Sequence, residues 1–186
     1  MTVEEIFSQI AQHMTEGLMF HSQLADYFEF LGMEGFKACH EYRFFDESTN
    51  YRRIVNYFMS HYNKLLVDLP FKNPGIIPEG WLKYNKFNVD TQTRKVGIQS
   101  GFERWVEWEK ETKAILEKFY KQFIEIGEVA SAIELKEYIK DVDIELAEAQ
   151  KEHLHLKAID YDMVEITSMQ HEIHQKYKKK MKELKV

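Results

Sequence analysis

The stretch Leu69–Gln99, LPFKNPGIIPEGWLKYNKFNVDTQTRKVGIQ, determines how the two halves of this chain can be connected. It holds all three prolines of the sequence, and proline interrupts helices because it has no amide hydrogen to donate. Links of this length are uncommon in a compact domain unless the topology requires them. About thirty residues can span roughly 100 Å when extended, so this link can return along the full length of a helical bundle.

Two pairs of long helices are predicted around this link, because apolar residues recur every three or four positions on both sides of it. Glycines separate the helices within each pair, so the connecting turns are short and we expect antiparallel neighbours. The predicted helices cover residues 3–31, 36–67, 102–126, 132–159 and 163–184, with a crossover at 69–100. The sequence therefore predicts an all-α four-helix bundle with one long crossover and a fifth, C-terminal helix.

The apolar rows indicate which residues face the core. The row of the first predicted helix consists of Ile6, Ile10, Gly17, Phe20, Leu24, Tyr27 and Leu31. The row of the second consists of Phe36, Phe44, Tyr51, Ile54, Phe58 and Leu65. The row of the fourth consists of Leu135, Ile139, Val142, Leu146, Ala149 and Leu156.

Local signals mark several element ends. Capping boxes, in which a short polar side chain and a glutamate three residues later satisfy first-turn amides, are predicted for Thr2 with Glu5, Ser100 with Glu103 and Ser131 with Glu134. Asp162 with Glu165 is a weaker version of the same pattern. Within the crossover, residues 87–89 and 95–98 flank a polar turn at 90–93, which predicts a small β-hairpin.

Composition narrows the class of protein. The 186 residues fit one domain, residues 1–186, and the net charge of −6 argues against nucleic-acid binding. Cys39 is the only cysteine, which excludes an internal disulfide and favours a reducing compartment. The sequence has neither a signal peptide nor an apolar run long enough to cross a membrane. We therefore expect a cytoplasmic protein, and a homodimer is the default oligomer.

Acidic residues stand in or beside the predicted core rows of the four long helices. Glu16, Glu47, Glu109 and Asp141 each belong to a different helix and lie near its middle. A buried carboxylate without a partner is costly, so such groups are usually paired, protonated or bound to a metal. One carboxylate from each helix is the arrangement that a metal pair in a bundle core requires.

Several segments resemble ferritins. The segments Gly32–Phe36 and Glu47–Arg52 are similar to the second ferritin helix, in which a turn and a phenylalanine precede a Glu-x-x-His metal motif. Trp108–Glu111 resembles the third helix, and Glu137–Asp141 resembles the stretch before the fourth-helix carboxylate. Glu16 falls near the glutamate of the first helix. The resemblance, over about residues 5–160, implies a ferritin-like fold and a di-iron carboxylate centre that uses iron or manganese with oxygen or peroxide.

The resemblance also implies a degenerate motif. The histidine of the second helix falls on Asn50, a second histidine falls on Ile144, and Asp141 stands in place of glutamate. His13 shares a helix face with Glu16 and can supply an imidazole. The predicted metal ligands are Glu16, Glu47, Asn50, Glu109, Asp141 and His13. Further replacement ligands are His40, His61 and His153.

Other interpretations stay open at this point. The acids can instead form a metal-free network with Arg43, Arg52 or Arg53 as counter-charges. The protein would then be a non-catalytic helical interaction or oligomerisation module with no cofactor. A weaker hypothesis is a small-molecule pocket built by the 13 Phe, 10 Tyr and 3 Trp. His171 and His174 are neighbours on the last helix, but a closed zinc site needs two more ligands. The sequence assigns no catalytic residue and leaves enzymatic activity open.

Overall fold

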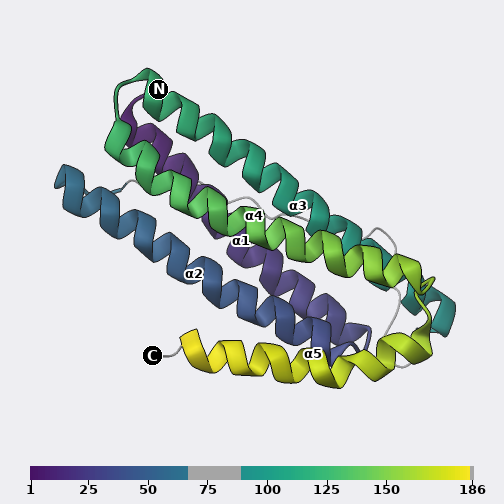
Figure 1. The fold of residues 1–186 in the computed structure, drawn as a ribbon. Helices are drawn as coiled ribbons and strands as arrows, with labels where there is room; N and C mark the ends of the chain where they lie inside the picture. Colours follow the sequence, from purple (N-terminus) through teal and green to yellow (C-terminus); the bar gives the residue numbers. More distant parts are fainter. Residues whose placement is uncertain (67–88, 185–186) are drawn as a thin grey trace.

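A computed structural model of the chain describes residues 1–66 and 89–184. These residues form five helices, namely α1 (Val3–Phe30), α2 (Glu34–Tyr62), α3 (Thr91–Glu125), α4 (Val129–Ala158) and α5 (Met163–Leu184). Helices α1 to α4 make an elongated bundle, and α5 packs along α2 (Figure 1). The described residues contain no strand, so the all-α prediction is confirmed. None of the helices in these two ranges has the length and apolar character needed to cross a membrane.

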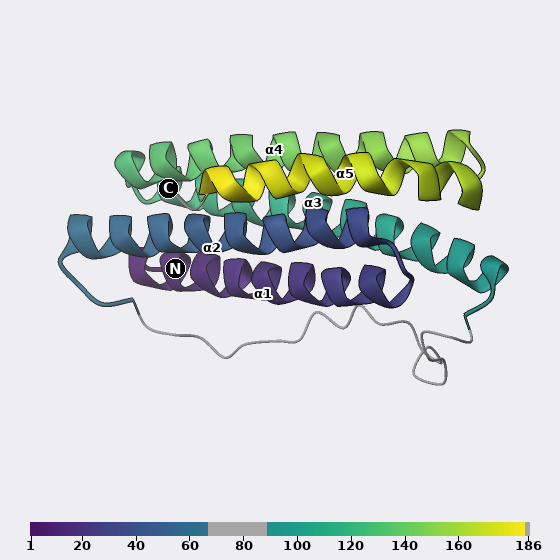
Figure 2. The same ribbon diagram turned by 90° about the horizontal axis from the view of Figure 1, so that it is seen from below.

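The topology consists of two antiparallel pairs. Helices α1 and α2 form one pair and α3 and α4 form the other (Figure 2). Helix α3 begins at the end of the bundle where α2 began, so these two helices run in the same direction. The end of α2 at Tyr62 and the start of α3 at Thr91 thus lie at opposite ends of the bundle, which is the connection that the predicted long crossover requires.

The third helix begins earlier than the sequence predicts. Helix α3 starts at Thr91 rather than at residue 102, and its N-cap is Asp90, whose side chain accepts a 2.6 Å hydrogen bond from the amide of Thr93. The predicted hairpin is consequently wrong for residues 91–98, which are helical; residues 87–88 lie outside the described part of the chain. Residues 90–93 begin a helix and do not form a hairpin turn. The prediction failed because short polar residues are favoured both at helix starts and in turns.

Of the other predicted helix ends and caps, the structure confirms some and contradicts others. Thr2 and Glu5 form the predicted capping box, and Asp162 accepts hydrogen bonds from the amides of Val164 and Glu165. Ser100 lies inside α3 and Ser131 inside α4, so neither caps a helix. The second helix ends at Tyr62 instead of residue 67, because Asn63 leaves the helix with a φ of 52°.

The core consists of two apolar clusters near the two ends of the bundle, separated by a polar layer. One cluster is built around Phe28, Phe36, Phe102 and Trp105. The other is built around Ile6, Phe58, Phe123 and Tyr138. Between them lie the buried polar side chains of His13, His21, His40, Arg43, Glu47, Asn50, Glu109, Thr112 and Glu145. The middle of the bundle therefore holds polar and charged side chains that are shielded from solvent.

Helix α5 is joined to the bundle by a contact that depends on a glycine. The N-cap residue of α2, Met33, offers no side-chain hydrogen bond. Gln170 of α5 replaces it, since its Oε1 accepts from the amides of Gly35 at 2.9 Å and Phe36 at 3.3 Å. A Cβ atom at Gly35 would lie 2.6 Å from the carbonyl oxygen of Gln170. The absence of a side chain at Gly35 thus lets α5 cap α2 from outside the bundle.

We predict that Gly35→Ala destabilises the protein and that Gly17→Ala does not. The alanine at position 35 must push α5 away from α2, and overpacking of this kind costs about 1–3 kcal/mol. At Gly17 the nearest atoms would be 3.5 Å and 3.6 Å from a new Cβ, so the higher helix propensity of alanine prevails. Urea unfolding followed by circular dichroism measures both variants. Equal losses of stability in the two variants would contradict the proposed role of Gly35.

Candidate metal centre

The buried face of α2 is polar in the middle of the helix. His40, Arg43, Glu47 and Asn50 follow one another at spacings of three and four, and all are buried. This spacing places the four side chains on one helix face that points into the bundle. The aromatic residue Phe44, which the apolar pattern favoured, is only partly buried. Helix α2 therefore places one basic side chain, one acidic side chain and one histidine in the core.

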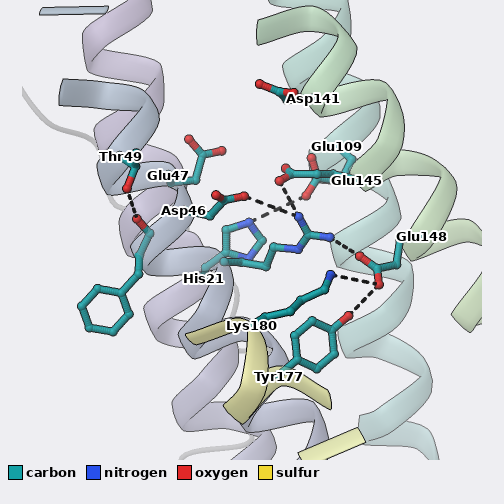
Figure 3. A network of polar contacts seen from close by, with 12 residues as sticks. His21, Asp46, Glu47, Thr49, Glu109, Asp141, Glu145, Glu148, Tyr177 and Lys180 are labelled. Atoms are coloured by element: carbon teal, nitrogen blue, oxygen red, sulfur yellow. Dashed lines mark hydrogen bonds and ion pairs between the residues drawn. The ribbon is translucent and has the colours of Figure 1, made fainter. Parts of the chain in front are cut away.

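Three glutamates from three helices meet in this layer. Glu47 of α2, Glu109 of α3 and Glu145 of α4 are 3%, 1% and 5% exposed, so water can screen none of them. Glu109 acts electrostatically on both Glu47 and Glu145, and Figure 3 shows Glu47 reaching into the layer from α2. Such a group of carboxylates is costly unless protons, cations or hydrogen bonds compensate it.

Each of these carboxylates accepts a hydrogen bond from a side chain. The Tyr138 hydroxyl donates to Glu47 Oε2 at 2.8 Å, and Trp105 Nε1 donates to Glu109 Oε1 at 2.9 Å. These two donors are neutral, so they orient the carboxylates without balancing their charge. Glu145 differs because its Oε1 accepts from the guanidinium of Arg43.

Burial and mutual repulsion favour the protonated forms of these acids. Burial raises the pKa of Glu47 to about 8, and the nearby Glu145 acts in the same direction. Burial also raises the pKa of Glu109 to about 8; Arg43 opposes this effect and Glu47 adds to it. The pKa of Glu145 lies well above its ordinary value because burial and Glu109 outweigh Arg43. At neutral pH the cluster consequently holds protons unless a cation replaces them.

Arg43 is the positive charge of the layer. Its guanidinium also donates to Glu148, and its Nη1 lies 3.8 Å from Asp46. Burial disfavours the charged guanidinium, but Glu145 and Glu148 outweigh burial and raise the pKa of Arg43. Glu148 has a second cation, since Lys176 Nζ lies 2.8 Å from its Oε1. Three buried carboxylates therefore share one guanidinium that is itself partly engaged elsewhere.

Helix α1 contributes no acid to the cluster. It places Gly17 beside Glu47, where a Cβ atom would lie 3.6 Å from the carboxylate carbon. One turn further along, His21 Nε2 lies 3.7 Å from Glu109 Oε1. On the other side of Gly17, His13 Nε2 is hydrogen-bonded to Thr112 Oγ1 at 2.9 Å. Burial lowers the pKa of His13 to about 4, so this imidazole is neutral.

The structure brings only part of the predicted ligand set together. Glu47 and Glu109 belong to the buried cluster, and Asn50 is buried one turn beyond Glu47. Glu16 is only partly buried and accepts a hydrogen bond from Gln12 of its own helix. Asp141 is 46% exposed and lies 3.5 Å from Arg53 Nη1. His13 faces Thr112, as described above.

The other predicted histidines have different surroundings. His40 is fully buried and pairs with His21 through their Nδ1 atoms at 3.0 Å. His61 is exposed near the end of α2, where it stacks on Tyr57. His153 is partly buried and packs against Tyr161. Of the three, only His40 lies in the polar layer.

Sequence reasoning missed Glu145, Glu148 and His21. On α4 the buried row runs through Tyr138, Val142, Glu145 and Ala149, while the apolar pattern selected the neighbours Ile139 and Leu146. Spacing could not separate the two rows, because both alternate by three and four residues between Leu135 and Ala149. His21 stands four residues after Gly17 and three before Leu24, which is again an inward position.

A polar pocket connects this layer with the surface. It has a volume of about 350 Å³ and is lined by residues of α2, α4 and α5, among them Arg43, Asn50, Asp141, Glu145 and Glu148. The pocket reaches the cluster on the side of Glu145. Of the three clustered carboxylates, Glu145 is therefore the one that borders this pocket.

Comparison with solved structures identifies the architecture. A humanised archaeal ferritin matches with a TM-score of 0.77 and 15% identity, over 92% of this chain and 94% of that chain. The chain has the ferritin-like fold. An engineered closed form of the Archaeoglobus fulgidus ferritin matches at 0.76 and 16% identity, over 92% and 93% of the two chains. The open-pore ferritin of the same archaeon matches at 0.75 and 16% identity, over 91% and 93%. Neither a protein-family model nor a curated protein matches the sequence.

Within this ferritin-like fold, the donor set suits one hard cation. In the two described ranges, no three His, Cys, Asp or Glu side chains already stand in a metal-binding arrangement. The buried acids Glu47, Glu109 and Glu145 nevertheless carry oxygen donors, which are the ligand type that hard cations accept. One divalent cation would neutralise the three carboxylates together with Arg43. The three carboxylates match a single ion in charge and in donor type, whereas their present placement does not form a metal-binding group.

We predict that the metal-free protein loses stability as the pH rises from about 4.5 to about 8. The folded-state pKa values of Glu47 and Glu109 are raised to about 8, above those of the unfolded chain. Their contribution is present at low pH and is lost as the pH rises through the folded-state values. Thermal unfolding in a chelating buffer should show a fall of several degrees. The double variant Glu47→Gln/Glu109→Gln should flatten this profile, and an unchanged profile would contradict the assignment.

We predict that Arg43→Met destabilises the protein by about 3 kcal/mol or more, because it leaves Glu145 buried without its cation. The control is Arg53→Met, which removes a pair with Glu134 and Asp141 whose members are 27–46% exposed. Exposed pairs contribute at most about 1 kcal/mol. Urea unfolding near neutral pH measures the difference. Similar losses in the two variants would show that Arg43 does not balance a buried charge.

Proposed function

We propose that this ferritin-like protein binds one divalent ion, iron(II) or manganese(II), on the carboxylates of Glu47, Glu109 and Glu145. The observation that carries the proposal is the charge of the buried layer, in which three carboxylates face one guanidinium. Two protons or one divalent cation would balance this layer. Carboxylate oxygens are ligands that iron(II) and manganese(II) accept readily.

Three features favour one ion over a pair. At the level of Glu47, helix α1 supplies Gly17 and therefore no ligand. Arg43 carries a positive charge beside Glu145 and Glu148, where a second cation would be repelled. Asp141, the remaining acid on α4 that the ferritin resemblance suggested, faces Arg53 near the surface. The proposed centre thus has fewer ligands than the di-iron arrangement expected from the sequence and holds one ion instead of two.

The residues around the proposed site have defined tasks. Tyr138 and Trp105 orient two of the carboxylates by hydrogen bonds, as outer partners of metal ligands commonly do. His21 directs an imidazole edge at Glu109 from the α1 side. The polar pocket beside Arg43 and Glu145 provides access from solvent. A bound iron or manganese ion would supply one-electron chemistry with oxygen or peroxide, as the ferritin resemblance implies.

The test is metal binding by protein purified without a histidine tag and stripped by a chelator. Manganese(II), and iron(II) under anaerobic conditions, are titrated by calorimetry, and bound metal is counted after dialysis. We expect one ion per chain and a higher melting temperature with metal, because a ligand of the folded state stabilises it. Binding should weaken at low pH, since protons compete for the same carboxylates.

Matched variants locate the ion. Glu47→Gln and Glu109→Gln should each lower the metal affinity by at least about tenfold, whereas Asp141→Asn and Glu16→Gln should leave it unchanged. Absence of binding by the unmodified protein would rule out the proposal. The observation of Arg43 bound to Glu145 and Glu148 would then favour the competing function, a non-catalytic helical protein whose acids are neutralised internally.

A further inference from the structure

A second pocket lies between α5 and the bundle, and we call it the α5 pocket. It has a volume of about 300 Å³, at the small end of the range for ligand sites. Its apolar wall is formed by Phe36, Phe102 and Trp105, and Ile173 of α5 covers it from the opposite side. Aromatic walls of this kind accept a flat apolar ring.

One polar group of this pocket has no partner. His40 lines the α5 pocket and is fully buried, and its Nε2 forms no hydrogen bond with any described residue. The Nδ1 edge of the ring is occupied by His21, which does not line the pocket. His40 thus lines the pocket with one ring nitrogen, Nε2, left unbonded. A buried nitrogen without a partner is costly in the empty pocket, and a ligand can remove this cost.

The ring of His40 is held in place. It stacks on Phe28 with centroids 5.4 Å apart and meets Trp105 edge-on at 4.7 Å. Burial lowers the pKa of His40 to about 3, and burial together with His40 lowers that of His21 well below its ordinary value. Both imidazoles are therefore neutral, and each carries one N–H group.

His40 Nε2 is the hydrogen-bonding atom that this ring leaves unused, because its Nδ1 is bonded to His21. A neutral imidazole nitrogen either donates or accepts, depending on the tautomer. A phenolic hydroxyl can do both, so a ligand that carries one satisfies His40 Nε2 in either tautomer.

The rim of the pocket carries negative charge. Glu152 of α4 and Glu172 of α5 line it together with Lys176. Lys176 is already engaged by Glu148 at 2.8 Å, whereas no ion pair joins Glu152 or Glu172 to any described residue. The rim therefore favours a cationic group outside the aromatic cavity.

We propose that the α5 pocket binds a small aromatic amine whose ring hydroxyl forms a hydrogen bond with His40 Nε2 and whose ammonium group lies between Glu152 and Glu172. The site is separate from the carboxylate cluster, and the proposal holds whether or not that cluster binds a metal. Cys39, which also lines the pocket, takes no part as a nucleophile, because burial raises the pKa of its thiol to about 11.

The test uses tyramine as the probe and two analogues that each lack one group. Phenethylamine has no hydroxyl, and p-cresol has no amine. Binding is measured by calorimetry and by the fluorescence of Trp105, which lines the pocket. We expect tyramine to bind with one molecule per chain, and each analogue to bind about tenfold more weakly. Absence of tyramine binding at millimolar concentration would overturn the proposal.

Three variants place the ligand. Ile173→Trp fills the pocket from α5 and should abolish tyramine binding, while Ile133→Trp, at a position 60% exposed on α4, should leave binding unchanged. His40→Phe keeps an aromatic ring but should remove the preference for tyramine over phenethylamine. Circular dichroism confirms that each variant is folded. Binding that survives Ile173→Trp, or a preference that survives His40→Phe, would show that the assignment is wrong.

Discussion

The pairing of Arg43 with Glu145 and Glu148 governs the middle of this bundle. Glu47 and Glu109 lie in the same layer with neutral hydrogen-bond donors as partners, so the guanidinium cannot balance all of the acids. Apolar clusters close the layer from both sides, and a charge that is not compensated there is expensive. Charge balance permits two compositions, one with added protons and one with a divalent cation. Solution pH and metal concentration would select between them.

Helix α5 participates in this balance although it lies outside the four-helix bundle. Its Lys176 and the Tyr177 hydroxyl both contact Glu148, and together with Arg43 they hold the pKa of that carboxyl at about 2, although burial acts in the opposite direction. Gln170 caps α2, the helix that carries Arg43 and Glu47. The fifth helix therefore fixes the position of α2, supplies a cation near the centre, and forms one wall of the α5 pocket.

The fold could be predicted from the sequence to a greater extent than the centre could. Apolar spacing identified the inward row of α1 and the pairing of the helices, because burial of apolar area decides both. On α4 the same rule selected Leu146, whereas the buried residue is its neighbour Glu145. Burial of that acid is tolerable only because Arg43 lies opposite on α2, and such long-range compensation leaves no periodic signal. Asp141 matched the ferritin pattern by position, yet Arg53 holds it near the surface.

The carboxylate cluster and the α5 pocket are neighbours in the core, with two histidines between them. Glu109 lies 3.7 Å from His21 Nε2, His21 is bonded to His40 through their Nδ1 atoms, and His40 lines the pocket. The distance from Glu109 to His21 is longer than a hydrogen bond, and His21 Nε2 has no hydrogen-bond partner among the described residues. No continuous path of hydrogen bonds therefore joins the two sites. The charge of the acids thus does not fix the tautomer of His40, and each site can be occupied without the other.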